Sequence, residues 1–228
     1  MNKSRHQIED TPFQQKSASH AILPGGRHPN DIRALVTTPD GVVWIGTADG
    51  LFTTSDQGFT RVEDVATGCP DIKCVSVADD GSLLVGTGHT LAERDSKGTW
   101  SILLDDTWDD GAITAAARNS DRITIATSHR GPLSVVGDSI QPLSDLYPSG
   151  ERVFCIVSSR DSTSILGEAG VTSSPPDLSA LRSHELKEHQ IRDLCIDGTI
   201  TYFATSDGLY KAEAGSAIRH VETPVRDL

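Results

Sequence analysis

The sequence has few cysteines, and this shortage removes one class of fold. Its four cysteines are too few to cross-link a chain of 228 residues through a disulfide framework. Cys74, Cys155 and Cys195 lie inside apolar, strand-like runs, where cysteine commonly packs as a small hydrophobic side chain. We therefore expect reduced thiols in the core.

Basic residues are also in short supply. The chain carries 20 Lys and Arg against 32 Asp and Glu, for a formal net charge of −12, and it has no block of Lys or Arg. Such a surface repels phosphate backbones and anionic lipid. We expect neither a nucleic-acid partner nor a membrane partner, whereas a small-molecule ligand or a protein partner fits this charge.

Long apolar runs are absent as well. No stretch approaches the roughly 18 apolar residues of a membrane-spanning helix. The N-terminal segment contains Gln7, Gln14, Gln15 and Lys16, and it has no apolar core of secretory length. The expectation is a soluble, cytoplasmic protein.

The strongest positive signal is an internal repeat. Its five units begin at Ile32, Ile72, Ile113, Val153 and Ile191, with spacings of 40, 41, 40 and 38 residues. Each unit holds four short runs rich in Val, Ile, Leu and Thr, separated by pairs such as Asp-Gly that suit tight hairpin turns. One four-stranded sheet cannot cover both of its own faces, so five sheets pack radially around an axis. The sequence predicts an all-β fold, a five-bladed β-propeller of four-stranded antiparallel blades.

The repeat also sets the predicted boundaries. A flexible tail is expected over residues 1–20 and a single propeller domain over 21–228, with blades at about 32–65, 72–105, 113–146, 153–186 and 191–222. Residues 178–189 are assigned to the outer strand and exit loop of blade four. Residues 21–23 could add a strand beside the last blade and help to close the ring. Blade five already has a predicted fourth strand at 217–221, so the mode of closure stays open.

One unit carries a family resemblance. The segment VVWIGTADGLF (42–52) resembles the repeat of two-component-regulator and sialidase-type propellers, and TSDQGFT (54–60) is similar to their Asp box, or BNR repeat. A degraded copy follows at Asp95, Gly98, Thr99 and Trp100. The resemblance implies a folding turn between third and fourth strands, remote from the ligand site. The catalytic Arg cluster, Tyr and acids of true sialidases have no counterparts in this chain, so sialidase activity is not expected.

Candidate catalytic residues come from one group of loops. In a propeller, the inter-blade loops and the loops between second and third strands emerge on one face around the central channel, here called the top face. One equivalent turn position holds Asp49, His89, His129, Ala169 and Asp207. Asp-Gly is a normal turn pair, which explains the two aspartates structurally. His89 and His129 depart from that pattern in adjacent blades and are the predicted catalytic residues.

The same face gathers possible metal ligands. The candidates are His28, His89, His129, His189, Asp49, Glu168 and Asp207. Imidazole suits Zn, Fe, Cu or Ni, and such a divalent metal with an open coordination position would supply a Lewis acid or an activated water. Two alternatives stay open: a metal-free histidine site that works by acid–base chemistry, and surface histidines gathered by chance. The string from His184 to His189 does not match the zinc-protease motif, because its two histidines are five residues apart.

Other side chains are candidates for ligand binding. Arg33, Lys73 and Arg192 follow the first apolar residue of blades one, two and five and could anchor an anionic ligand. The alternative is ordinary pairing with the neighbouring acids Asp31, Asp71 and Asp193. Trp108 could line the mouth of the channel, whereas Trp44 is predicted to pack between blades.

Two functions fit these observations. The first, slightly favoured, is a small enzyme whose histidine-lined top face performs lyase, hydrolase or proton-transfer chemistry on a small molecule. The second is a non-catalytic module that binds a sugar, a peptide or a partner protein on the same face. The sequence has no nucleophile elbow, phosphate-binding loop or dinucleotide fingerprint, which leaves the substrate class open.

Overall fold

The regular structure in the described part of the chain consists of strands. The computed structural model describes residues 22–25, 28–56, 58–63, 65, 70–105, 111–120, 122–137, 139–145, 147–148, 150–159, 162–168, 170–174, 191–197, 200–205, 208–213 and 219–220. The strands β1 to β19 lie within these ranges and are joined by turns and loops. None of them belongs to a helix that is long and apolar enough to cross a membrane.

Blades one to three are four-stranded antiparallel sheets in which neighbouring strands are consecutive in the sequence. Blade one consists of β1 (Ile32–Thr37), β2 (Val43–Thr47), β3 (Gly50–Ser55) and β4 (Gly58–Arg61). Blade two consists of β5 (Cys74–Val77), β6 (Leu83–Gly86), β7 (Leu91–Arg94) and β8 (Trp100–Leu104). Blade three consists of β9 (Ile113–Asn119), β10 (Arg122–Thr127), β11 (Gly131–Val136) and β12 (Ser139–Pro142).

Blades four and five continue the same order. Blade four shows β13 (Val153–Ser159), β14 (Ser162–Gly167) and β15 (Gly170–Ser174). Its predicted outer strand over 178–189 lies outside the described residues. Blade five consists of β16 (Ile191–Asp197), β17 (Ile200–Thr205), β18 (Leu209–Glu213) and β19 (Arg219–His220), so the predicted fourth strand near 217–221 is confirmed over two residues.

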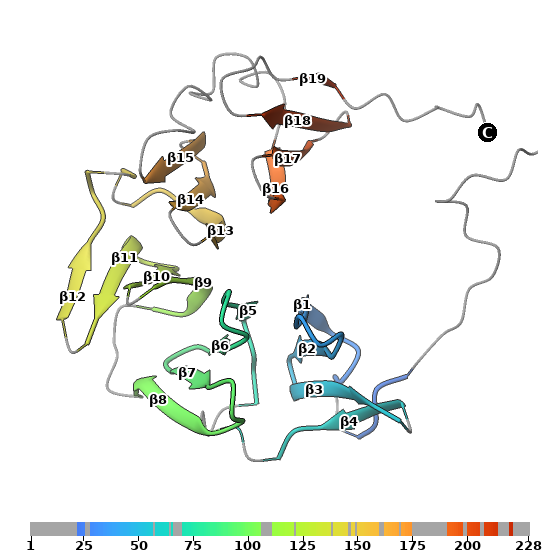
Figure 1. The fold of residues 1–228 in the computed structure, drawn as a ribbon. Helices are drawn as coiled ribbons and strands as arrows, with labels where there is room; N and C mark the ends of the chain where they lie inside the picture. The colour runs from blue at the N-terminus through green and yellow to red at the C-terminus, as the bar shows by residue number, and fades with distance from the viewer. Residues whose placement is uncertain are drawn as a thin grey trace, which may run out of the picture.

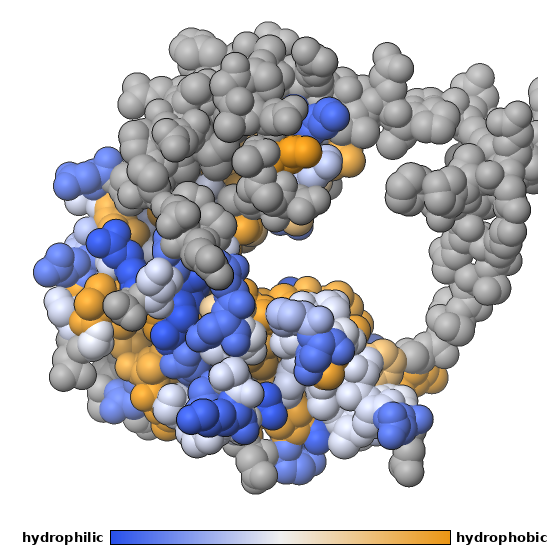
Figure 2. Space-filling view, in the orientation of Figure 1, coloured by the Kyte–Doolittle hydropathy of each residue, from blue (hydrophilic) through white to orange (hydrophobic). Residues whose placement is uncertain are grey.

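The blades form the predicted five-bladed β-propeller. Each blade places its first strand nearest the axis, and these inner strands pack in series: β1 on β5, β5 on β9, β9 on β13 and β13 on β16 (Figure 1). Both whole-molecule views show an opening between blade five and blade one (Figures 1 and 2). The described residues of these two blades therefore do not complete the ring.

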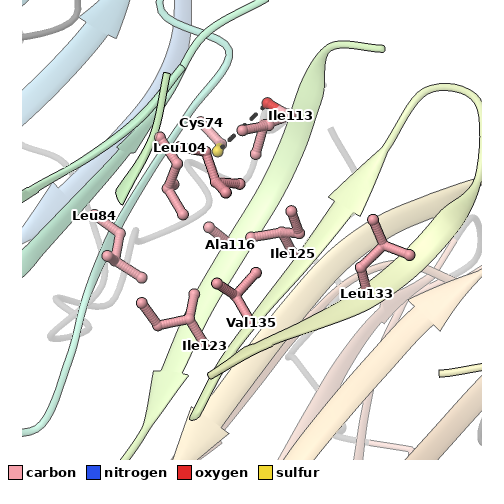
Figure 3. Close-up of a cluster of buried hydrophobic side chains, with 10 residues drawn as sticks. Cys74, Leu84, Leu104, Ile113, Ala116, Ile123, Ile125, Leu133 and Val135 are labelled. Carbon is pink, nitrogen blue, oxygen red and sulfur yellow. Dashed lines mark hydrogen bonds between the residues drawn. The ribbon is translucent and has the colours of Figure 1, made fainter. Parts of the chain in front are cut away.

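The core lies between successive blades, because each strand turns alternate side chains toward its two neighbours. Between blades two and three, Leu84 and Leu91 pack with Ile125 and Leu133, all at most 2% exposed. Figure 3 shows Leu84, Ile125 and Leu133 in this cluster. Burying one such side chain stabilises the fold by roughly 1.5–3 kcal/mol. Trp44 lies in the equivalent cluster between blades one and two, which confirms its predicted place.

The segment before blade one differs from its prediction. The described residues 22–25 form no strand beside the last blade. Instead Leu23, which is 4% exposed, packs against Ile45 and Phe52 on the face of blade one that looks away from blade two. This apolar contact provides a physical reason for the difference, because it gives Leu23 a buried place without strand pairing. The predicted tail at residues 1–20 lies outside the described residues.

Candidate functional site

A threonine holds the top-face turn in the first two blades. In blade one the Thr47 hydroxyl donates to the Gly50 carbonyl (3.0 Å) and accepts from the Asp49 N–H (3.1 Å). In blade two the Thr87 hydroxyl accepts from the His89 N–H (3.2 Å) in the same way. Asp49 and His89 thus leave the backbone from matching turns, as the repeat predicts.

The other blades vary this turn. In blade five Thr205 donates its hydroxyl to the Gly208 carbonyl (2.8 Å). In blade three the turn is one residue longer, and Thr127 accepts from the Arg130 N–H (3.0 Å). Blade four has Gly167 at the threonine position, as strand pairing with Val153 shows. The position of His129 is therefore equivalent to that of His89 in sequence but not in turn geometry.

Asp49 serves the structure of the top face. Its carboxylate accepts the backbone N–H of His28, which ties the entry loop to the turn. Its carbonyl accepts from the Arg61 guanidinium at 2.9 Å. His28 is exposed and takes part in this bond through its backbone, not through its ring.

His129 lies against the loop that enters blade three. A Cβ placed on Gly111 would be 2.8 Å from the His129 Nδ1, so the ring sits directly over this glycine. The neighbouring Ser128 clamps the same loop: its hydroxyl accepts from the Ala112 N–H (3.1 Å), and its N–H donates to the Ala112 carbonyl (2.9 Å). Trp108 belongs to this loop but lies outside the described residues.

The rings of His89 and His129 are available to a ligand. Both residues are exposed. With the described part of the chain, neither ring makes a hydrogen bond or an ion pair. A histidine that the fold does not use, beside a turn that the fold holds, is suited to bind or to exchange a proton.

The cations at the start of blades one and two are paired. Arg33 contacts Asp31 at 3.2 Å and also Asp71, and Lys73 contacts Asp71 at 2.7 Å. Asp71 thereby links a cation of blade one to a cation of blade two. These partly exposed pairs are worth about 0–1 kcal/mol each. Asp31 and Asp71 already neutralise the two cations, which favours ordinary ion pairing over the predicted role of Arg33 and Lys73 as anchors for an anionic ligand. The side chain of Arg192, the third predicted anchor, is not among those described.

The predicted metal site stays a prediction. Within the described ranges, no three His, Cys, Asp or Glu residues are grouped so that they could hold an ion. Glu168, a predicted ligand, accepts the Arg152 N–H at 3.5 Å. His189 and Asp207, which complete the predicted ligand set, are outside those ranges.

Comparison with known proteins supports the repeat and the fold. Residues 26–49 match the profile of the family described as two component regulator propeller. The comparison with curated proteins finds no match. The chain is thus a β-propeller repeat protein that resembles this family over one repeat.

Solved structures of a lyase and of the extracellular domain of a one-component system share the fold. The chain is similar to virginiamycin B lyase from Staphylococcus aureus, with 14% identity and a TM-score of 0.55 over 86% of this chain and 71% of the lyase. A catalytically inactive variant of that lyase, with a histidine replaced by alanine and with quinupristin, matches at 13% identity over 86% of this chain and 71% of its own, with a TM-score of 0.53. The extracellular domain of a one-component system from B. thetaiotaomicron matches at 13% identity and a TM-score of 0.59 over 90% of this chain, which spans only 32% of that protein. At these identities the likeness is one of fold alone.

Proposed function

We propose that this propeller binds a small molecule on its top face and that His89 and His129 perform acid–base chemistry on it. The observation that carries the proposal concerns the two imidazole rings. Both rings are exposed, neither has a partner among the described residues, and they lie in turns of adjacent blades. Thr87 and Thr127 hold those turns, so the fold positions the histidines without using their rings.

The chemistry follows from imidazole itself. A neutral imidazole accepts a proton near neutral pH and an imidazolium donates one, so a pair of histidines can abstract a proton from a substrate and protonate its leaving group. Lyase and hydrolase reactions both need these two transfers. A general acid or base typically contributes 10²–10⁴-fold, by order of magnitude, to such a reaction.

A lyase of similar fold supports the proposal of a histidine-dependent reaction. The lyase described above becomes catalytically inactive when one histidine is replaced by alanine. That property belongs to the lyase, whose chain is 13% identical to this one. It makes a histidine-dependent reaction on a propeller scaffold the first activity to test.

A second candidate is ligand binding without turnover. The pairing of Arg33 and Lys73 with Asp71 favours it, because these paired side chains offer no reactive group. The match to the extracellular domain of a one-component system is consistent with such a module. The two candidates share the ligand site and differ in whether His89 and His129 act on the ligand.

The test is a ligand screen followed by substitution. Compounds that raise the melting temperature are assayed for turnover with wild type, His89→Gln and His129→Gln, and with His28→Gln as an exposed histidine of the same face. We expect both site variants to lose at least tenfold in kcat/KM, with melting temperatures unchanged, while His28→Gln keeps wild-type activity. Ligands that bind without turnover, and still bind the variants, would establish the non-catalytic alternative instead.

A further inference from the structure

A second concave site lies between blades one and two, away from the top face. It is a groove with a cavity volume of about 580 Å³, within the size of small-molecule sites. The β1–β2 turn at residues 38–42 and the β5–β6 turn at residues 79–81 form its rim. Strand β2 begins beside this groove at Val43 and ends on the top face at Thr47, so the two sites lie at opposite ends of the blade.

Arg94 is the cation of the groove. Its guanidinium carbon lies 5.2 Å from the centroid of the Trp44 ring, which lines the groove and is 6% exposed. The guanidinium also lies close to Gly98, where an added Cβ would be 2.8 Å from the Arg94 Nη2. The guanidinium thus lies over the indole within cation–π distance, yet among the described residues its N–H groups make no hydrogen bond or ion pair. Guanidinium N–H groups in a fixed fork suit a carboxylate.

Three carboxylates face the same space. Asp40, Asp79 and Asp80 all line the groove. Asp40 accepts the Thr38 hydroxyl (2.5 Å) and Asp80 accepts the Ser82 N–H (2.9 Å), each through one oxygen. The hydrogen bond from Thr38 is the main cause that lowers the pKa of Asp40, and the side chain of Ser82 is the main cause that lowers the pKa of Asp80. Asp40 and Asp80 are therefore ionised at neutral pH, and each keeps one carboxylate oxygen without a hydrogen bond from the described residues.

We propose that this groove binds a zwitterionic small molecule of the amino-acid class, with the ligand carboxylate on Arg94 and its ammonium group among Asp40, Asp79 and Asp80. A simple anion is disfavoured, because three carboxylates line the same groove as the single guanidinium. A simple amine would pair with the acids but would provide no hydrogen-bond acceptor for the Arg94 guanidinium. Three acids and one guanidinium leave the groove negative, so amino acids with a second cationic group bind best. This site does not depend on the top-face histidines.

Among the described residues, the groove acids are not arranged as a metal-ion site. The described residues include no set of three His, Cys, Asp or Glu side chains that could hold a metal ion, and the groove acids belong to that search. The acids and the guanidinium instead come from the ends of neighbouring blades and face one cavity. A cavity lined by charges of both signs matches a ligand that carries both charges.

The test is calorimetric titration of the full chain at low ionic strength with lysine, alanine and glutamate, and with lysine blocked at its carboxylate as the amide or at its α-amine as the N-acetyl derivative. We expect affinity to fall from lysine to alanine to glutamate, and each blocked lysine to bind at least tenfold more weakly than lysine. Equal binding of lysine and its amide, tighter binding of glutamate, or no amino acid bound at 10 mM would overturn the proposal.

Variants connect the binding to the groove. Arg94→Gln is expected to abolish the preference for a free carboxylate, with Arg122→Gln, an exposed arginine of blade three, as the matched control. Because Arg94 also packs on Trp44, Asp79→Asn provides a second variant: this exposed acid makes no bond with the described residues, and its loss lowers lysine affinity without unfolding the blade. The His89→Gln, His129→Gln double variant keeps wild-type lysine affinity, so failure of the top-face proposal leaves this result unaffected. Wild-type lysine affinity in both groove variants would contradict the assignment.

Discussion

Gly86, at the end of β6, shows how closely two blades approach one another. A Cβ at this position would lie 2.6 Å from the Cys74 Sγ and 2.9 Å from the Ile113 Cγ2 of the next blade. We predict that Gly86→Ala lowers the free energy of unfolding by about 1–3 kcal/mol, because the core must shift to accept the methyl group. Gly88 has no atom within 4 Å of an added Cβ, so Gly88→Ala is the control and changes stability by less than about 0.5 kcal/mol. Equal stabilities of the two variants in urea unfolding would contradict this packing.

The buried thiol of Cys74 predicts a pH dependence. Burial raises its pKa from 9.0 to about 12, so the unfolded chain releases this proton before the folded chain does. The stabilisation by the neutral buried thiol is present below pH 9 and falls, by about 1.4 kcal/mol per pH unit, as the pH rises from there toward the folded-state pKa. In urea unfolding at a series of alkaline pH values, Cys74→Ala should show a shallower fall than wild type. The exposed Cys195 provides the control Cys195→Ser, and a Cys74→Ala slope identical to wild type would rule out the effect.

At the scale of elements, the threonine turns make another prediction. The buried Thr87 hydroxyl accepts from two N–H groups, those of His89 (3.2 Å) and Thr90 (3.0 Å). Thr87→Val keeps the shape and removes the acceptor, so we expect it to cost about 1–3 kcal/mol in thermal unfolding. Thr87→Ser retains the hydroxyl and should recover most of that loss. If Val and Ser are equally tolerated, the hydroxyl does not hold the turn.

Local patterns predict the strands well and the turns less well. Alternation within each run and turn pairs such as Asp40-Gly41 depend on near neighbours in sequence, and all of the predicted inner strands occur in the structure. The extra residue beside His129 was not predicted, because the length of that turn becomes visible only from the pairing of Thr127 with Gly131. Sequence spacing alone therefore predicted the same turn around His89 and His129, whereas the turn at His129 is one residue longer.

The groove was missed for a different reason. Arg94 reaches Trp44 across a blade interface, a contact between residues 50 positions apart in the sequence that no local pattern reports. One signal was present: the turn between first and second strands carries acids in both blades, as Asp40 in one and as Asp79 and Asp80 in the other. An acidic repeat position is hard to distinguish from ordinary turn chemistry without the arginine beside it.

At the scale of the whole molecule, net charge predicts a response to salt. A formal net charge of −12 on 228 residues repels itself in the compact state, and added ions screen that repulsion. We predict that the melting temperature rises as NaCl is increased from about 0.01 M to about 1 M, where the screening length shrinks from about 30 Å to about 3 Å. Choline chloride at matched ionic strength controls for specific sodium binding. A melting temperature that falls with both salts would show that ion pairs such as Arg118–Glu93 (2.7 Å) outweigh the repulsion.

The repeat period predicts how many blades there are but not how the ring is closed. Five units at near-constant spacing give five blades, as observed. The opening between β16 and β1 depends on the angle between successive blades (Figure 1). That angle is set by the side chains packed in each interface, such as Trp44 against Ile72 and Val75, and not by the length of the repeat.

The central claim is that histidines of two adjacent blades serve one site, and a double-mutant cycle tests it most directly. The measurement is kcat/KM for a turned-over compound with wild type, His89→Gln, His129→Gln and the double variant. Residues that act as a unit are strongly non-additive, so the account predicts a double variant about as impaired as the worse single variant. Losses that simply multiply, or a double variant as active as wild type, would contradict a shared site.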